Sequence, residues 1–421
     1  MSANGSLLQT DSKPLAGVVV VDVTLAFAGP LASLLLAGLG ATVLKVERPR
    51  SGDMSRTNPP YLGRDGVALG ARADDDLALP FINRSRGKLS VTLDLKSPEG
   101  VSVFHDLVDR ADVLLENNAS GALDALGLGY EQLSARNPRL VYCSVTGFGA
   151  AATGHDRRAF DLMIQALSGV MGATGEEGAA PMRQGIVVGD ILAPLMGVIG
   201  ILAALRERER SGLGQHVDAS MLDALTSLVA AEHFDALAKC GVPTRTGNSL
   251  ARMAPFGAYP TRTAYVAICA PSDDFMRSLA RVMGRPELMD DPRFATRHAR
   301  TEHRVALDAE IEAWTASLDA GEVVRLLLDA NVPAAEVRDP LDALRDPRVL
   351  EHGAVVPLRH PLHGDTGDVL GTGVPLRFSR SSAGFDGLEA PFLGEHNRLV
   401  YGAFLGYDDE RLQALEDGGV I

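Results

Sequence analysis

Short, largely apolar runs alternate with helical patterns along the first 150 residues of the chain. The run at 18–23 is continuous, apolar and β-branched, as in a strand that is covered on both faces. We expect further strands at 41–47, 89–95, 112–116 and 140–145. The segments 31–39 and 99–111 between them show apolar positions at helical spacing, and Pro30 suits the first helical turn. This alternation predicts an α/β chain with an open parallel sheet.

The pattern changes after residue 190. We expect helices at 191–210 and 221–239, a strand at 265–269, and a helix that Ser272 caps and that runs to Met283. The longest apolar run, 191–205, contains Pro194 and is shorter than the roughly 20 residues of a membrane span. It predicts a buried helix rather than a membrane segment. The pattern predicts one long loop at 59–76, and loops of this length usually contribute to a binding site or active site.

Composition narrows the possible functions. The chain has 421 residues and a net charge of −14, which excludes nucleic-acid binding through a broad basic surface as its main activity. Its three cysteines, Cys143, Cys240 and Cys269, are far apart, so neither a zinc site nor a disulfide framework is expected. No secretory signal pattern precedes Pro14. These features favour a cytoplasmic protein without a metal.

The segment 185–194, GIVVGDILAP, carries the most suggestive single residue. Asp190 follows an apolar run and precedes the long apolar helix. An aspartate in this place is most often a helix N-cap. A carboxylate that helix amides keep ionised among apolar neighbours can also act as a nucleophile, so both interpretations stay open. No GxGxxG, P-loop or GxSxG motif is present.

Many ordered motifs together resemble family III CoA-transferases, the CaiB/BaiF type that includes formyl-CoA transferases and α-methylacyl-CoA racemases. The most specific matches are GATVLKVE at 40–47 and ADVLLEN at 111–117. The resemblance covers nearly the whole chain and is weakest over 240–350. Further matches lie at 15–17, 28–30, 51–53, 83–84, 88–96, 127–130, 137–139, 147–149, 160–169, 212–215 and 393–396.

The resemblance implies a fold, a partner and a mechanism. The fold would be a large Rossmann-like domain, formed by 1–220 and completed by 345–421, with a smaller α+β domain at 221–344. Two such chains would form an interlocked homodimer. Asp190 matches the family's catalytic aspartate, which attacks an acyl-CoA thioester and forms first a mixed anhydride and then an aspartyl-CoA thioester. Coenzyme A and acyl-CoA would be substrates, with no permanently bound cofactor.

The resemblance also implies which residues contact CoA. Arg48 matches a basic position at the nucleotide end, Leu93 and Lys96 match positions near the adenine and its phosphates, and Met221 matches the pantetheine path. Arg48, Lys96 and a third basic residue, Arg158, would supply local positive charge for a polyanion. Taken singly, each is more typical of a solvated surface. The remaining implied contacts are Asn117, Ala122, Phe27 and Ala28.

Departures from the family pattern bear on the substrate. A basic position of some members is Ala125 here, and a glutamine that faces the reaction centre in oxalate-using members is Phe27. Their glycine-rich lid is absent near 250–258. The changes at Phe27 and in the lid argue against formyl-CoA:oxalate exchange, and Ala125 implies that one phosphate contact is missing. A dicarboxylic donor such as succinyl-CoA is what the habit of the family implies.

Two alternatives to CoA transfer remain. The racemases place a proton-transferring histidine immediately before the position of Asp161, but Phe160 stands there, and the pair His155 and Asp156 lies five residues too early. Transfer is therefore favoured over racemisation. A non-catalytic acyl-CoA-binding subunit, partnered with a paralogous chain, is the alternative of another class, and the presence of Asp190 argues against it.

Overall fold

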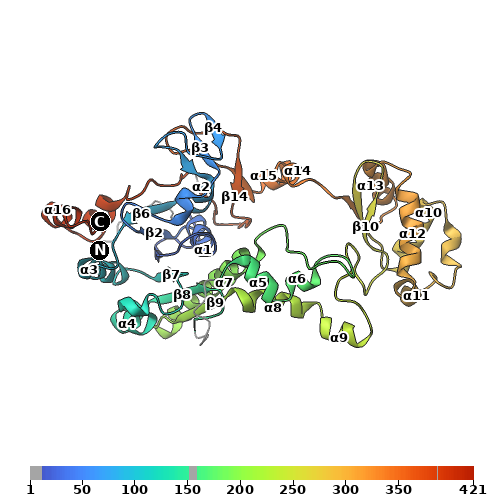
Figure 1. Cartoon of the computed structure of the whole chain (residues 1–421), viewed down its shortest axis with the longest axis horizontal. Helices are drawn as coiled ribbons and strands as arrows, with labels where there is room; N and C mark the ends of the chain where they lie inside the picture. The colour runs from blue at the N-terminus through green and yellow to red at the C-terminus, as the bar shows by residue number, and fades with distance from the viewer. Residues whose placement is uncertain (1–11, 151–158, 386) are drawn as a thin grey trace. The chain divides into compact units, whose positions relative to one another are not determined.

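The structure is a computed structural model of the chain, and it describes residues 12–150, 159–385 and 387–421. The chain divides into two compact units, whose elements are labelled in Figure 1. The larger unit lies within 1–168, 185–228 and 344–421, and the smaller unit comprises 169–184 and 229–343.

A six-stranded sheet in which every neighbouring pair is parallel forms the centre of the larger unit. The strand order is β6-β2-β1-β7-β8-β9. The sequence therefore predicts the fold class and most strands correctly, but misses the last one, β9. The strands are β1 (Val19–Asp22), β2 (Thr42–Glu47), β6 (Lys88–Thr92), β7 (Val113–Glu116), β8 (Val141–Thr146) and β9 (His216–Ser220).

Helices cover both faces of this sheet, which explains why its strands are apolar on both sides. On one face, α1 (Ala28–Gly38) and α7 (Val188–Ser211) pack together, and α7 also lies on β8 and β9. Gly197 of α7 allows this close approach, because a Cβ there would stand 3.4 Å from the Cys143 sulfur. The other face carries a core with α3 (Pro98–Val108), α4 (Tyr130–Arg136), the π-helix η4 (Arg398–Phe404) and α16 (Asp409–Asp417).

The helix α7 is long and apolar enough to cross a membrane by length and composition. In the structure one of its sides is buried against the sheet, so the sequence prediction of a buried helix holds for that side only. The helix begins three residues earlier than expected, at Val188, and Gly212 ends it in a left-handed conformation.

The segment expected as a loop at 59–76 is instead a small antiparallel sheet, so that expectation was wrong. Strand β3 (Tyr61–Gly63) pairs with β4 (Gly66–Ala68) and with β5 (Leu77–Ala78), and α2 (Leu79–Ser85) follows. A second small antiparallel pair joins β13 (Val355–Pro357) to β14 (Leu370–Thr372). Shorter elements of this unit are η1 (Met54–Thr57), η2 (Asp124–Leu126), α5 (Asp161–Leu167), α8 (Met221–Ala231, which crosses into the smaller unit) and α15 (Pro347–Glu351).

The smaller unit has its own apolar core between an antiparallel sheet and a set of helices. Its strands are β10 (Phe256–Pro260), β11 (Tyr265–Cys269) and β12 (Ala334–Glu336). Ser272 caps its first long helix through the Phe275 N–H, as expected. The helices are α6 (Val170–Ala173), α9 (Phe234–Lys239), α10 (Asp273–Val282), η3 (Pro286–Met289), α11 (Arg297–Glu302), α12 (Arg304–Thr315), α13 (Ala320–Asp329) and α14 (Pro340–Leu344).

The expected helix 221–239 is two helices, α8 and α9. His233 separates them with a positive φ of 54°, a conformation that no α-helix continues through. The apolar spacing on either side of this residue is helical, which is why the sequence pattern does not reveal the break.

Candidate active site

Most residues expected to contact CoA follow the carboxyl ends of the parallel strands. Phe27 and Ala28 come after β1, Arg48 after β2, and Asn117 after β7. The strand order reverses between β1 and β7, because β2 and β6 extend to one side and β8 and β9 to the other. A crevice at such a reversal is where open α/β sheets usually bind ligands.

The remaining expected CoA residues differ in exposure. Lys96 and Ala122 are exposed, as is Arg48, whereas Leu93 is 1% exposed. Met221 is buried at the start of α8, and a Cβ on Gly189 would lie 3.3 Å from its methyl carbon. Arg158 lies outside the described residues, together with the pair at 155 and 156.

Asp190 is the third residue of α7 and is not its N-cap. The N-cap position is Val187, which makes no side-chain capping bond. Throughout the described chain, the Asp190 carboxylate has no hydrogen-bond or ion-pair partner. A carboxylate that is free of such bonds keeps its lone pairs available for a substrate.

Asp161, the first residue of α5, performs the capping role instead. Its Oδ1 accepts from the Gly189 N–H at 2.8 Å, and its Oδ2 accepts from Gln165 Nε2 at 2.6 Å. Asp161 is 7% exposed, and its carboxylate is bonded to the residue that precedes Asp190. The Gly189 N–H is therefore already committed, and so is the Ile191 N–H, which donates to Val187.

The surroundings make Asp190 unusually basic. Burial and then the negative charge of Asp161 raise the pKa of Asp190 from 3.8 to about 6, while the positive charge of Arg84 acts in the opposite direction. A carboxyl group with this pKa is still about nine-tenths ionised at pH 7. It is thus both charged and more nucleophilic than an ordinary aspartate.

The loop 24–27 between β1 and α1 is held by side chains from other segments. Asn117 accepts from the Leu25 N–H at 2.8 Å and donates to the Leu25 carbonyl at 2.9 Å. Lys45 donates to the Thr24 carbonyl at 3.0 Å. Asp53 accepts from the Ala26 N–H at 3.1 Å, so the backbone of this loop is fixed almost completely.

This bonding explains a strained residue at the site. Ala26 has a φ of +67°, which a non-glycine residue seldom adopts and which costs about 1–3 kcal/mol. The two bonds of Asn117 and the bond of Asp53 compensate for that cost. Gly29 is also required here, because a Cβ at this position would stand 2.3 Å from Thr24 Cβ.

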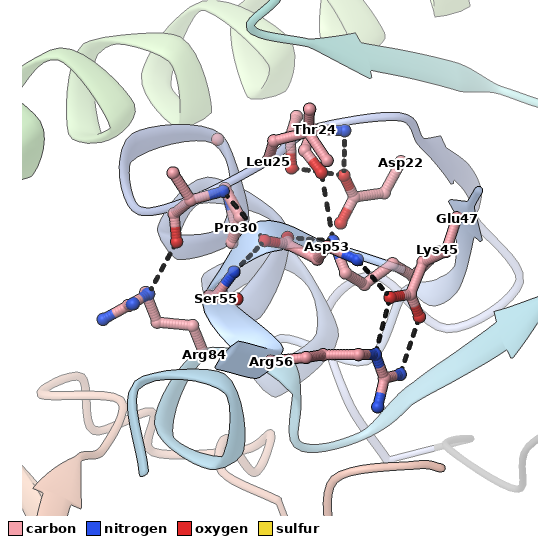
Figure 2. Close-up of polar contacts among 12 residues, drawn as sticks. Asp22, Thr24, Leu25, Pro30, Lys45, Glu47, Asp53, Ser55, Arg56 and Arg84 are labelled. Carbon is pink, nitrogen blue, oxygen red and sulfur yellow. Dashed lines mark hydrogen bonds and ion pairs between the residues drawn. The ribbon is translucent and has the colours of Figure 1, made fainter. Parts of the chain in front are cut away.

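A buried cluster of charges lies beneath the loop, as Figure 2 shows. Lys45 pairs with Asp53 at 2.8 Å, and both side chains are fully buried. Burial opposes ionisation of Asp53, but the charge of Lys45 outweighs it and lowers the Asp53 pKa to about 2. Glu47 accepts from the Asp53 N–H at 2.9 Å and pairs with Arg56 at 2.8 Å. These buried ion pairs and hydrogen bonds hold the loop 24–27 in one conformation.

A second buried pair supports the start of α1. Lys88 lies 3.3 Å from Asp22 and donates to the Pro30 carbonyl at 3.0 Å. Asp22 in turn accepts from the Thr24 N–H at 2.8 Å and from the Ser33 hydroxyl. The loop and the helix that follows it are therefore anchored to the sheet from both ends.

Sequence reasoning missed the roles of Asp161 and Arg84, although both lie in quoted motifs. The sequence places Asp161 29 residues before Asp190, and only the fold brings its carboxylate to Gly189. Arg84 lies near the end of α2, and its Nε donates to the Ala26 carbonyl at 3.2 Å. For Asp161 the available signal was a charged residue in the otherwise largely apolar stretch 160–167, whereas Arg84 stands in the polar stretch 83–88, where no such contrast marks it.

The chain resembles known proteins over nearly its full length. The family model of CoA-transferase family III matches residues 15–397. The succinyl-CoA–D-citramalate CoA-transferase of Chloroflexus aurantiacus is 35% identical over 416 residues, covering 98% of this chain and 99% of that protein. The succinyl-CoA:mesaconate CoA-transferase of Haloarcula hispanica is 36% identical, covering 94% of this chain and 98% of that protein.

Solved structures show the same likeness. A CaiB/BaiF family protein from Brucella suis is 35% identical and superposes with a TM-score of 0.79, covering 94% of this chain and 100% of that one. The fold described above, with its parallel six-stranded sheet, is therefore shared with that protein.

Proposed function

Because the chain belongs to CoA-transferase family III and is a CoA-transferase, we propose that Asp190 is the catalytic nucleophile. We also propose that the CoA donor is a dicarboxylyl-CoA, with succinyl-CoA the first choice. Enzymes of this kind use CoA thioesters as substrates. The preference for succinyl-CoA is supported by relatives whose names specify it or its acid, with citramalate, mesaconate or glutarate as the other acid.

The first half of the reaction loads CoA onto the enzyme. A carboxylate oxygen of Asp190 attacks the thioester carbonyl carbon, the carbon–sulfur bond breaks, and CoA leaves as a thiolate. The product on the enzyme is a mixed anhydride. The thiolate then attacks the aspartyl carbonyl of this anhydride, which releases the donor acid as a carboxylate and leaves an aspartyl-CoA thioester.

The second half repeats these steps with the acceptor acid. Its carboxylate attacks the aspartyl-CoA carbonyl, and thiolate leaves again. The thiolate then attacks the acceptor's own carbonyl carbon in the new anhydride. This restores the Asp190 carboxylate and gives the product acyl-CoA, so neither a proton nor water is consumed.

The unbonded state of the Asp190 carboxylate within the described chain carries this proposal. A nucleophile must exchange its contacts with solvent for bonds to substrate, and among these residues Asp190 has no protein partner to lose. Its raised pKa near 6 increases its nucleophilicity without neutralising it at pH 7. The fixed loop 24–27 would hold the reacting groups in register.

The CoA contacts are part of the same proposal. Arg48 and Lys96 lie exposed beyond the ends of β2 and β6 and would pair with phosphates, and Arg158 would do the same. Leu93 and Ala122 would border the adenosine, and Met221 the pantetheine chain. The amide of Asn117 is occupied by Leu25, so its contribution would be to hold the loop that carries Phe27 and Ala28.

The alternatives fit less well. Phe160 precedes Asp161 and offers no group that could move an α-proton, which disfavours racemisation. A subunit that only binds acyl-CoA does not require a nucleophilic aspartate without hydrogen-bond partners, which Asp190 is within the described chain.

We further propose that the enzyme is a cytoplasmic homodimer, with interlocked chains. Four residues of α7, namely Leu195, Met196, Ile199 and Leu202, are 37–58% exposed although apolar. A row of exposed apolar side chains along one helix is typical of a protein interface. Sedimentation equilibrium would give twice the chain mass, and a single-chain mass would contradict this part of the proposal.

The test is CoA transfer by the purified protein from succinyl-CoA to D-citramalate, mesaconate, glutarate and oxalate in turn. We expect product acyl-CoA with at least one of the first three acids, and none with the Asp190→Asn variant at equal concentration. Exchange of the α-proton of a 2-methylacyl-CoA with deuterated water, without transfer, would instead establish the racemase.

A further inference from the structure

Arg84 is an arginine that the fold buries without giving its charge a partner among the described residues. It lies near the end of α2 and is 8% exposed. Its Nε donates to the Ala26 carbonyl, and its guanidinium carbon lies 4.3 Å from the centre of the Phe27 ring. These two contacts fix the plane of the guanidinium beside the loop 24–27.

The two terminal nitrogens of Arg84 are unpartnered. Among the described residues, neither makes a hydrogen bond or an ion pair, and Figure 2 shows a contact only at Nε. The polar atoms that are fully enclosed and unsatisfied in the described chain are Arg86 Nε and His396 Nδ1. The terminal nitrogens of Arg84 are not among them, so they reach open space.

The other buried arginines differ from Arg84 in this respect. Arg208 pairs with Asp112 at 2.9 Å, and Arg300 pairs with Asp273 at 2.7 Å. Arg86 donates to the carbonyls of Asn83 and Thr372. Each uses at least one terminal nitrogen within the protein. Burying a cation without an anion is costly, so the open side of Arg84 calls for an anion from outside the chain.

The position of Arg84 indicates which anion this is. Its guanidinium lies against the loop 24–27, which leads into α1, and α1 packs on α7, the helix that begins with Asp190 in its first turn. The charges of the two side chains also act on each other's pKa. They nevertheless form no ion pair, which leaves the guanidinium fork free. A planar guanidinium whose two terminal nitrogens are both free can bind a carboxylate through two parallel hydrogen bonds, and a carboxylate is the anion that an acyl group can present beside Asp190.

We propose that Arg84 binds the second carboxylate of a dicarboxylic acyl group, the one that is not joined to CoA, and so selects dicarboxylic over monocarboxylic substrates. This inference rests on the proposed function, because it assumes that the acyl group is presented to Asp190. Phe27 holds the guanidinium flat from one side, and the Ala26 carbonyl holds it at Nε. Arg84 is thus a substrate-binding residue whose support is the loop 24–27.

The test compares two donors of equal length that differ only at the far end. Succinyl-CoA ends in a carboxylate and butyryl-CoA ends in a methyl group. In Arg84→Gln we expect the ratio of kcat/KM for succinyl-CoA to kcat/KM for butyryl-CoA to fall about 100-fold, the effect of losing a bidentate charge-assisted contact that only succinyl-CoA makes. Arg84→Lys should recover part of the loss, since it keeps the charge but not the fork.

Arg86→Gln is the matched control, because Arg86 is also buried and lies two residues away, yet its bonds go to backbone carbonyls. This variant should change both donors equally. Equal losses for both donors in Arg84→Gln would overturn the inference and leave Arg84 acting only on the charge of Asp190 or on the fold. The proposed transfer reaction would still stand in that case.

A binding measurement separates this inference from the transfer reaction itself. Saturation-transfer NMR with glutarate and valerate, which have the same chain length, needs no turnover. The unmodified protein should bind glutarate in preference, and Arg84→Gln should lose that preference. If the protein transfers CoA from no donor, this measurement still decides: a glutarate preference that survives in Arg84→Gln would overturn the assignment.

Discussion

The raised pKa of Asp190 implies that the charge of this carboxylate destabilises the fold, and replacing the residue should reveal by how much. Its carboxyl pKa is about 6 in the folded chain, whereas the ordinary aspartate value is 3.8. The difference is about 2.2 units, which corresponds to about 3 kcal/mol at about 1.36 kcal/mol per unit. Asp190→Asn removes the charge while keeping the shape, so it should raise the free energy of unfolding.

The stability that Asp190→Asn gains depends on pH in a defined way. Well below the ordinary pKa of 3.8 the carboxyl is protonated in the folded and unfolded states alike, and its charge costs nothing. As pH rises through 4 to 6, the unfolded chain ionises first, so the folded state loses stability until Asp190 is itself ionised. The gain from Asp190→Asn should therefore be about 3 kcal/mol at pH 7.5 and about 1 kcal/mol at pH 4.5.

Thermal melting followed by circular dichroism at both pH values, at one protein concentration, measures this gain. We expect the variant to melt a few degrees higher at pH 7.5, with a smaller difference at pH 4.5. Asp223→Asn is the control, because Asp223 is an exposed aspartate in the first turn of α8 and should show no such pH-dependent gain. A variant that melts at or below the unmodified protein at pH 7.5 would refute the reasoning.

Three further outcomes follow from the same geometry. Asp161→Asn removes a negative charge beside Asp190, so the acidic limb of kcat/KM against pH should move to lower pH, and an unmoved limb contradicts this. Arg48→Gln and Lys96→Gln should each raise KM for acyl-CoA about tenfold with little change in kcat, because each removes one exposed phosphate contact. Steady-state kinetics at saturating acceptor measures this change. Unchanged KM values would mean that these residues do not contact CoA. Asn117→Ala leaves the Leu25 N–H and carbonyl without their partner, so it should lower the free energy of unfolding by about 1–3 kcal/mol. Urea denaturation measures this loss, and an unchanged urea midpoint would contradict the role of Asn117 in the loop.

The fold class was predictable because its signals are local. A strand that is buried on both faces is largely apolar, and β1, β2 and β8 are visible in the sequence for that reason, although β1 and β2 also carry the buried charges of Asp22, Lys45 and Glu47. The cap of Ser272 on α10 is equally local, since donor and acceptor are three residues apart. Within such segments the sequence differs from the structure by only a few residues at the ends.

The features that the sequence did not reveal depend on contacts between distant segments. The β3–β5 pairing joins Tyr61 to Ala78 across a segment that is polar and rich in glycine, so it reads as a loop. The break at His233 is a matter of one backbone angle. Asp190 could be identified as a candidate from its motif, but whether it caps α7 depends on where the helix begins, and α7 begins at Val188, with Asp161 bonded to the Gly189 N–H of its first turn.

The central claim is that CoA becomes covalently attached to Asp190. The most direct measurement is to incubate the protein with succinyl-CoA without acceptor, reduce with borohydride, and analyse its peptides by mass spectrometry. Borohydride reduces an aspartyl thioester to the alcohol, so we expect homoserine in place of Asp190, only with donor present and not in Asp190→Asn. An unmodified Asp190 in a protein that turns over the same donor, or a modification at another residue, would contradict the claim.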